Sequence, residues 1–325
     1  MLALVGDIGG TRSRLRLLDL AADNVKILFH REYSTNEFDT FTAVVHRFLE
    51  DTQSSAAPDY ACIAAAGPMT GRTLQLTNVP WLLDADGLSS ELGIVSVTLL
   101  NDLVAAAHGV DYLQPKDVRT LQAGSRDDRR PGVILGVGTG FGQAMFVRTS
   151  NSFEVYGTEG GHVDFAPATP MAVELLQYLW PTLDHVSVET VLSGPGLERV
   201  YAFMSRRANR PAKGVTTAAT ITEMAVDGDT VARDTIDQFV ALLAAQAGNI
   251  ALQTLPCSGV YLVGGTIVPL LGYLLPEAFA VPFNGKGVMS SLLRQIPVSL
   301  ILNQDVGIMG AGGYLVRKMK NAGEL

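Results

Sequence analysis

The chain has 325 residues, of which 47% are hydrophobic and 17% are charged, and its formal net charge at pH 7 is -8. This length exceeds the size at which one hydrophobic core stops growing, so we expect two folded domains and no disordered region. The acidic balance repels phosphate backbones and argues against a nucleic-acid partner.

Cysteine usage and hydropathy indicate the cellular compartment of the protein. Cys62 and Cys257 lie far apart in apolar stretches, without a CxxC pair or clustered histidines nearby, which favours a reducing compartment. The opening residues lack the basic region of a signal peptide. The longest apolar stretch, 239–255, contains Gln246 and Asn249 and is shorter than the roughly 20 residues that span a bilayer. We therefore expect a buried helix there and a cytoplasmic protein with no membrane partner.

The first elements along the chain are predicted to be three strands and a helix. The apolar run 2–5 is broken by GDIGGT, and leucines then alternate with arginines over 12–18, which indicates a hairpin. Residues 25–33 predict a third strand. Apolar residues at helical spacing follow over 38–49.

Two continuous apolar runs then predict buried parallel strands. Residues 60–66 end in Gly67 and Pro68, and residues 95–100 end in an Asn-Asp pair. Functional groups of open α/β sheets gather at the carboxyl ends of the strands, so both endings are candidate site loops.

The second half repeats this plan. A strand at 132–137 is interrupted by GTGFG and resumes at 143–147, while 259–263 and 298–302 predict further buried strands that end in GGT and NQD. This similarity suggests an internal duplication with a cleft between the copies. A C-terminal helix is expected over 307–320, packed back on the first domain.

Two glycine-rich turns carry the strongest chemical signal. Backbone without Cβ atoms can approach a phosphate and offer N–H donors, and an acid beside it could hold a magnesium shell. In the first turn the candidates are Gly6, Asp7 as the acid, Ile8, Gly9, Gly10 and Thr11; in the second they are Gly138, Thr139, Gly140 and Gly142. The plainer explanation of either turn is an ordinary tight hairpin. Gly264 and Gly265, after a later strand, would suit a nucleotide lying against backbone.

Two common nucleotide folds are excluded by their motifs. The chain contains no GxxxxGK[ST], so it is not a P-loop NTPase, and no GxGxxG follows the first strand.

The chain resembles the bacterial-type glucokinase family along essentially its full length. The resemblance is carried by VGDIGGTRSRL, LLNDLVAAA, GVGTGFG, EGGHVDFAP, HVSVETVLSGPGLERVY and GIMGAGGYL. It implies an α/β, actin-like ATPase (ribonuclease H-like) fold whose two domains flank a cleft. The expected domains are a small one, 1–111 plus 306–325, and a large one, 112–305. It also implies phosphorylation of D-glucose to glucose 6-phosphate in glycolysis, with ATP and Mg²⁺ as cofactors, and family habit with the apolar content suggests a homodimer.

The resemblance assigns roles to the Asn-Asp pair. Asp102 would be the general base that accepts the proton of the 6-hydroxyl as it attacks the terminal phosphate, and Asn101 would orient the sugar. The plainer explanation is a helix N-cap, which Asp102 could provide as well.

Three further residues are assigned to the sugar by the same resemblance. Glu159 and His162 lie three residues apart around two glycines, and Glu189 lies in SVETVLSGPG. Carboxylates accept hydrogen bonds from vicinal hydroxyls, so a wrong epimer would leave buried polar groups unpaired. Without the resemblance, His162 would be a structural histidine and Glu189 a solvated helical glutamate.

Some features depart from the family pattern, and other functions stay open. Arg12 stands where the family commonly has Asn, and GGTIVPLL carries an extra residue near the nucleotide. The zinc motif of the repressor, open-reading-frame and kinase (ROK) superfamily is absent. The alternatives are a kinase for another hexose or an amino sugar, a sugar-responsive regulator, and a phosphatase or acyl-phosphate enzyme of the same fold; a regulator would carry an N-terminal DNA-binding helix pair, whereas this hairpin begins at residue 3.

Overall fold

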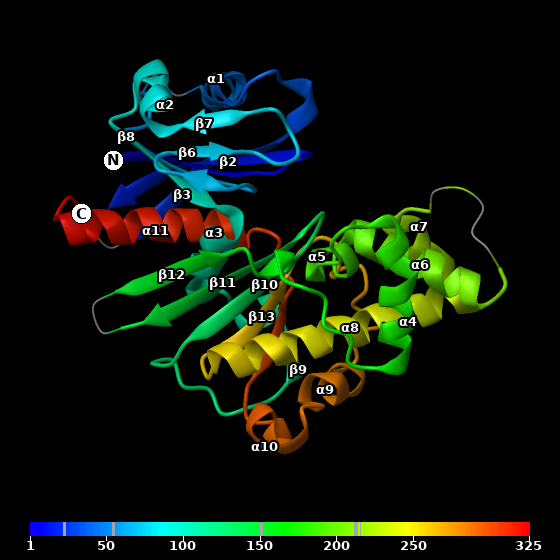
Figure 1. The fold of residues 1–325 in the computed structure, drawn as a ribbon. Coiled ribbons are helices and arrows are strands. Elements are labelled where there is room, and N and C mark those ends of the chain that lie inside the picture. The colour runs from blue at the N-terminus through cyan, green and yellow to red at the C-terminus, as the bar shows by residue number, and fades with distance from the viewer. Residues whose placement is uncertain (22–23, 54–55, 150–151, 211–213, 215) are drawn as a thin grey trace. The chain divides into compact units, whose positions relative to one another are not determined.

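The computed structural model describes residues 1–21, 24–53, 56–149, 152–210, 214 and 216–325. Contacts divide these into two compact units, one of residues 1–113 and 305–325 and the other of residues 114–304 (Figure 1). The boundaries expected at 111 and 306 lie close to these, and independent folding of the two parts stays a prediction. Among the described residues no helix is both long and apolar enough to cross a membrane.

The first unit is built on a five-stranded sheet with the order β3-β2-β1-β4-β8. The expected glycine-rich hairpin is present as the antiparallel pair β1–β2, and β4 pairs in parallel with both β1 and β8. A small antiparallel sheet of β5, β6 and β7 follows β4. The strands are β1 (Leu2–Ile8), β2 (Arg12–Ala21), β3 (Asn24–Ser34), β4 (Tyr60–Ala65), β5 (Met69–Thr70), β6 (Thr73–Gln75), β7 (Leu82–Asp84) and β8 (Ser96–Asn101).

Helices cover both faces of the five-stranded sheet, with α1 and α2 on one face and α3 and α11 on the other (Figure 1). Leu4 and Ile8 point into the α1–α2 core, and Ala3 and Val5 point into the α3–α11 core, as the two-residue period of a strand requires. The C-terminal helix therefore packs on the first unit, as expected. The helices are α1 (Phe41–Thr52), α2 (Ala85–Leu92), α3 (Asp102–Gly109), α11 (Val306–Ala322) and the 3-10 turns η1 (Thr35–Glu37) and η2 (Val110–Tyr112).

The first helix begins later than its apolar spacing predicted. Thr40 is its N-cap and accepts a hydrogen bond from the backbone N–H of Ala43 at 3.2 Å. Phe38 therefore lies outside the helix and packs edge-on against the Tyr33 ring. A local capping bond, which satisfies an unpaired helical N–H, sets this boundary.

The second unit repeats the strand plan of the first. Its sheet has the order β12-β11-β10-β13-β14-β9, in which β10–β11 is an antiparallel hairpin and β13 pairs in parallel with β10 and β14. The predicted repetition is thus confirmed at the level of topology. The strands are β9 (Val118–Gln122), β10 (Gly132–Val137), β11 (Phe141–Arg148), β12 (Phe153–Thr158), β13 (Gly259–Val263) and β14 (Val298–Ile301).

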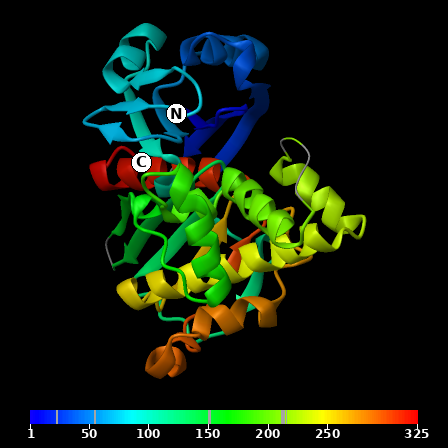
Figure 2. The same cartoon turned by 45° about the vertical axis from the view of Figure 1, so that its right-hand side comes forward.

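One large core joins this sheet to its helices. The predicted buried helix at 239–255 is the C-terminal part of α8, which packs against α6, α7 and α9 (Figure 2). The helices are α4 (Pro170–Leu179), α5 (Val188–Val191), α6 (Gly194–Arg207), α7 (Ala218–Val226), α8 (Thr230–Thr254), α9 (Pro276–Asn284) and α10 (Ser290–Leu293), with 3-10 turns η3 (Pro115–Asp117), η4 (Gly160–His162), η5 (Trp180–Thr182) and η6 (Gly287–Met289).

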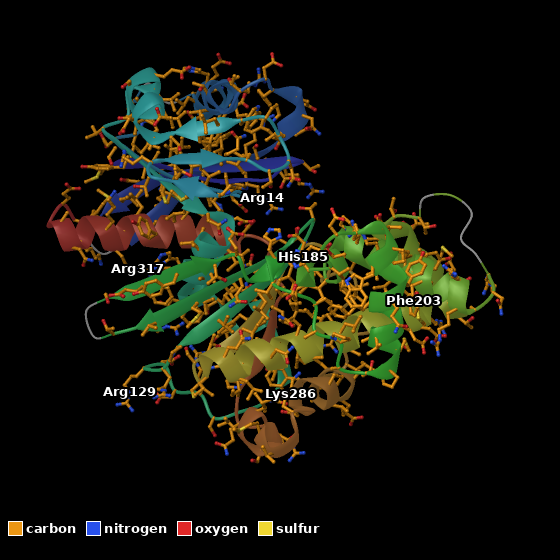
Figure 3. All side chains as sticks on the ribbon, in the orientation of Figure 1. Arg14, Arg129, His185, Phe203, Lys286 and Arg317 are labelled. Carbon is orange, nitrogen blue, oxygen red and sulfur yellow. The ribbon has the colours of Figure 1, made fainter. Side chains whose placement is uncertain are left out.

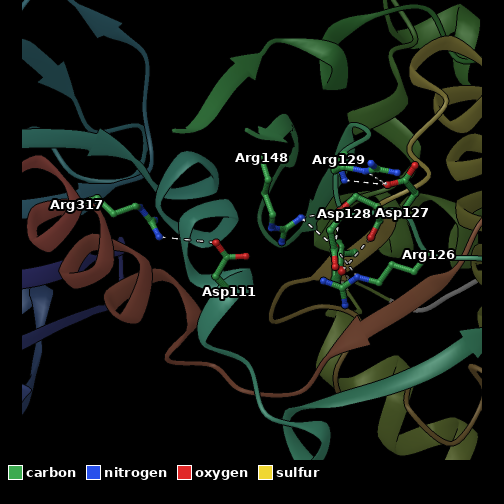
Figure 4. A network of polar contacts seen from close by, with 9 residues as sticks. Asp111, Arg126, Asp127, Asp128, Arg129, Arg148 and Arg317 are labelled. Atoms are coloured by element: carbon green, nitrogen blue, oxygen red, sulfur yellow. Dashed lines mark hydrogen bonds and ion pairs between the residues drawn. The ribbon is translucent and has the colours of Figure 1, made fainter. Parts of the chain in front are cut away.

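Arg148 fixes the far end of the β10–β11 hairpin. Its guanidinium donates to the Ser258 hydroxyl at 2.6 Å and lies 4.8 Å from the centre of the Phe146 ring. Asp128 lies 3.6 Å away, and Figure 4 shows the guanidinium directed toward it. An ion pair and a cation–π contact thus hold this end of the sheet together.

Candidate active site

The register of the first sheet brings two predicted acids to one edge. Ile8 of β1 lies opposite Ala65 of β4, which lies opposite Asn101 of β8. Asp7 and Asp102 therefore lie near the carboxyl ends of strands that flank β4. Because the two charges repel each other, the Asp102 carboxylate contributes to the raised pKa of Asp7.

The turn between β1 and β2 is held in shape by hydrogen bonds. The Gly9 N–H donates to the Arg12 carbonyl at 2.8 Å, and the Thr35 hydroxyl donates to the Gly9 carbonyl at 2.8 Å. Thr35 is fully buried and also bonds the Ser13 hydroxyl at 2.9 Å. Thr35 was not among the predicted site residues, because nothing in the local sequence links a residue after the third strand to this turn.

Asp7 is the electrostatic centre of this turn. The pKa of Asp7 is raised to about 6, chiefly by burial and then by the Asp102 charge, while the Arg14 guanidinium, 3.7 Å away, lowers it. Arg14 is labelled in Figure 3. A Cβ on Gly307 would lie 3.2 Å from Asp7 Oδ2, so α11 begins directly against this carboxylate. A carboxylate so disfavoured is suited to a cation or a proton donor.

In the Asn-Asp pair, the helix cap is provided by a different residue from the one expected. Asn101, and not Asp102, is the N-cap of α3, and its side-chain oxygen accepts from the N–H groups of Leu103 at 3.0 Å and Val104 at 3.4 Å. Its amide also donates to the Gly67 carbonyl at 3.3 Å. Asp102 is the first helical residue, and burial raises its pKa although the Leu103 N–H bonds it at 2.9 Å. The cap thus fixes the backbone from which Asp102 extends.

The oxygen-rich edge of the first sheet fits a magnesium ion that arrives with phosphates. Magnesium is bound in proteins through one or two carboxylates plus substrate phosphates. Asp7 and Asp102 supply two mutually repelling carboxylates there. Among the residues that the structure describes, no group of three or more His, Cys, Asp or Glu residues is arranged to hold a metal by itself.

In the second unit, the Gly138–Gly140 turn is bonded to two other segments. The Gly138 carbonyl accepts from the Gly194 N–H at 2.8 Å and from the Thr266 hydroxyl at 3.0 Å. Gly264 has φ of +133°, and a Cβ there would lie 2.1 Å from the Val137 carbonyl, so only glycine fits. The structure therefore brings two predicted nucleotide segments together. Gly194 and Thr266 were missed as partners, although Thr266 directly follows the two glycines.

Glu189 is tied to this same turn. It lies in the short helix α5, and its Oε2 accepts a hydrogen bond from the Phe141 backbone N–H at 2.8 Å. The plainer explanation, a solvated helical glutamate, is therefore wrong. The carboxylate is half-buried and is oriented by the turn, which leaves its other oxygen for a ligand.

Glu159 and His162 are brought together as a pair at η4. The His162 N–H donates to the Glu159 carbonyl at 3.0 Å, and their side chains approach to 4.0 Å. The side chains are 80% and 61% exposed, respectively, so His162 is not a core histidine. Thr139 and Gly265 are exposed as well. These groups therefore lie at the surface and are not part of a hydrophobic core.

Comparisons with known proteins identify a family for the chain. A model of the glucokinase family matches residues 4–318. A glucokinase of Nostoc sp. is 36% identical over 333 residues, which cover 95% of this chain and 97% of that protein. The crystal structure of a glucokinase from an Antarctic psychrotroph has a TM-score of 0.84 at 32% identity, covering 97% of this chain and 98% of that one.

A more distant structure shares the fold. The ROK family glucokinase from Streptomyces griseus, in complex with glucose and AMPPNP, has a TM-score of 0.67 at 20% identity and covers 98% of this chain and 100% of that one. The architecture is the two-domain actin-like ATPase fold predicted above. Since the family model and the Nostoc relative both span nearly all of the sequence, the chain belongs to the glucokinase family.

Proposed function

We propose that this sugar kinase transfers the terminal phosphoryl group of ATP to the 6-hydroxyl of D-glucose, with Asp102 as the general base. The observation that carries the proposal is the place of Asp102. It follows a buried strand, stands as the first residue of a capped helix, and has a pKa that burial raises. A carboxylate with a raised pKa is a better proton acceptor than one in open water.

Asn101, Glu159, His162 and Glu189 would bind the sugar hydroxyls. The support is that hydrogen bonds orient two of these side chains: the Glu189 carboxylate accepts from the Phe141 N–H, and the Asn101 side-chain oxygen accepts from the Leu103 N–H. A hydroxyl that is missing or inverted would leave one of these groups unpaired, which costs more than a mismatched apolar contact. Because the relatives are glucokinases, we expect glucose, and not another hexose, to be the substrate of this chain.

The donor would be held by the two glycine-rich hairpins. The first turn supplies Gly6, Asp7, Ile8, Gly9, Gly10 and Thr11, and the second supplies Gly138, Thr139 and Gly140, with Gly264 and Gly265 beside the adenosine. Asp7 would hold the magnesium shell, and bound Mg²⁺ would neutralise charge on the phosphates. The relative from Streptomyces griseus, solved with AMPPNP, supports a nucleotide donor.

Phosphoryl transfer of this kind asks the protein mainly for positioning and charge. Asp102 accepts the hydroxyl proton as the sugar oxygen forms its bond to phosphorus, and ADP leaves with the electrons of the broken P–O bond. The remaining groups orient the two substrates and exclude water.

The proposal includes a reducing cytoplasm, a role in glycolysis and a homodimer. The support is the sequence: two separated cysteines, and the family's habit of pairing. Light scattering tests the last point, because a dimer has about twice the 34.6 kDa mass of one chain.

The function is tested by a coupled assay for glucose 6-phosphate with purified protein, glucose, ATP and magnesium, beside mannose, fructose and glucosamine. Strong preference for glucose is the expected result. Turnover on another sugar would keep the mechanism and replace the substrate, and binding without turnover would make the chain a sugar sensor.

A further inference from the structure

A row of three arginines lies on one face of β2. Arg12, Arg14 and Arg16 alternate with the buried residues Ser13 and Leu15, so all three side chains leave the same face of the strand. The register places Arg14 opposite Asp7 on β1 and opposite Glu32 on β3. The row thus runs between two strands that each contribute one carboxylate.

The inner arginines of this row are held more firmly than the outer one. Arg16 forms an ion pair with Asp305, and Arg14 donates from Nε to Glu32 at 2.9 Å. Arg12 reaches the other oxygen of Glu32 at 3.5 Å, so the two arginines share one carboxylate. The Arg12 side chain is 60% exposed, against 22% for Arg14.

Arg12 and Arg14 line an open pocket of about 410 Å³. Its other lining residues belong to the glycine-rich turn, and the full set is Asp7, Gly9, Gly10, Thr11, Arg12 and Arg14. A pocket with two guanidinium groups and glycine backbone is suited to a chain of phosphates. Asp7 is its one carboxylate, and the proposed function assigns it to magnesium.

We propose that Arg12 binds a terminal phosphate of the donor and that Glu32 competes with the donor for it. In the free protein, Glu32 holds Arg12 at the pocket rim; when a polyphosphate enters, the guanidinium exchanges this carboxylate for phosphate oxygens. This inference rests on the proposed function for the location of the donor. It assigns donor affinity, and not sugar affinity, to a residue that departs from the family's usual Asn.

Charge and geometry explain why this exchange favours the donor. The pair is partly exposed, so the carboxylate holds Arg12 only weakly in water. A phosphate group offers more negative charge and two oxygens in the fork geometry that a guanidinium prefers. Neighbouring Arg14 keeps Glu32 occupied after Arg12 leaves.

Opposite effects of two substitutions test the exchange. Arg12→Asn should weaken binding of AMPPNP and of inorganic tripolyphosphate by about tenfold, because it removes a charge-assisted contact. Arg12→Lys should recover part of this loss, since it keeps the charge but not the fork. Glu32→Gln should strengthen binding of both probes by about threefold, because the competing charge is lost.

Calorimetry with each probe at low and high KCl gives these affinities, and initial rates give the KM for ATP and for glucose separately. In Arg12→Asn the salt dependence of tripolyphosphate binding should become shallower, while the KM for glucose stays unchanged. Arg72→Asn is the matched control, because Arg72 is 56% exposed and pairs with Asp86 in the same unit. It should leave every affinity unchanged.

The outcomes separate this inference from the proposed function. If the wild-type protein phosphorylates glucose and Arg12→Asn binds both probes as well as wild type, the inference is wrong and the function stands. If probe binding depends on Arg12 but no sugar is phosphorylated, the inference stands and the function is wrong. If Glu32→Gln weakens binding, Glu32 does not compete with the donor and the exchange is refuted.

Discussion

The two glycine-rich hairpins share a topology and differ in what surrounds them. In each, a strand pairs antiparallel with the next strand and parallel with a central strand. The β1–β2 turn is surrounded by charges, with Asp7 opposite Arg14. The β10–β11 turn is held by hydrogen bonds to the Gly138 carbonyl and the Phe141 N–H. The same backbone topology therefore supports a turn surrounded by charged side chains in one unit and a turn fixed by hydrogen bonds in the other.

The difference predicts where substitutions should act. Changes beside the first hairpin should alter charge, and hence proton transfer and the pH dependence of stability. Changes beside the second should alter hydrogen-bond geometry, and hence the orientation of a ligand.

The largest effect is expected for Asp102→Ala beside the first hairpin. Without its base, kcat should fall by at least about 100-fold, while glucose binding by calorimetry should be largely retained, because the base acts mainly in the transition state. Turnover within about tenfold of wild type would remove Asp102 from the role of base.

A smaller effect is expected for Glu189→Gln beside the second hairpin. Loss of the carboxylate charge should weaken glucose binding by about tenfold and leave AMPPNP binding unchanged. Glu159→Gln is the companion variant: it should also weaken sugar binding, but it should not lower the midpoint of thermal unfolding, since Glu159 is 80% exposed. Unchanged glucose affinity in Glu189→Gln, measured by calorimetry, would contradict the assignment.

Asp7→Asn should separate stability from activity. The folded-state pKa of Asp7 is raised from 3.8 to about 6, so the ionised group opposes folding. Its favourable contribution is present below about pH 4 and is lost as pH rises through about 6. Asp7→Asn should therefore unfold with a free energy up to about 2 kcal/mol higher at pH 8, with little difference at pH 4.

Urea denaturation without magnesium measures this difference, and the coupled assay should show that the stabilised variant has lost most of its activity. Equal stability of the two proteins at pH 8 would show that Asp7 is not disfavoured when ionised. The groups that face Asp7 and set this balance are Asp102, Asp305, Arg14 and Arg16.

The smallest effect is expected for Thr266→Val at the second hairpin. It removes the hydroxyl that donates to the Gly138 carbonyl and should cost about 1 kcal/mol of unfolding free energy. AMPPNP affinity should also fall, because the Gly138 turn loses a hydrogen bond that holds its shape. The control is Thr254→Val, which removes a hydroxyl bonded within α8 and should leave AMPPNP affinity unchanged. If both variants change AMPPNP affinity equally, the hydrogen bond to the Gly138 turn does not contribute to nucleotide binding.

Local patterns were enough to predict most of the fold. Both hairpins, the parallel strands and α11 follow from alternation, apolar runs and glycine breaks. Boundaries failed where one side chain decides them: Thr40 starts α1 three residues after the apolar spacing begins, and Asn101 takes the cap that Asp102 was thought able to provide. Such bonds depend on geometry that the identity of a residue does not reveal.

Candidate site residues could be named from the sequence, but the hydrogen bonds that connect them could not. Thr35 bonds Gly9, which lies 26 residues earlier in the chain, and Thr266 bonds Gly138 across 128 positions. Neither distance leaves a local signal. Glu189 shows the converse, since base rates favour a solvated glutamate, and only the fold makes it an acceptor for the second turn.

The return of α11 to the first unit has a consequence for synthesis. Ile308, Ala311 and Leu315 complete the core on one face of its sheet, and Gly307 lies against Asp7. A ribosome makes residues 114–304 before it makes these. We therefore expect the second unit to condense first on the nascent chain, while one apolar face of the first unit's sheet stays uncovered until residues 305–325 are made.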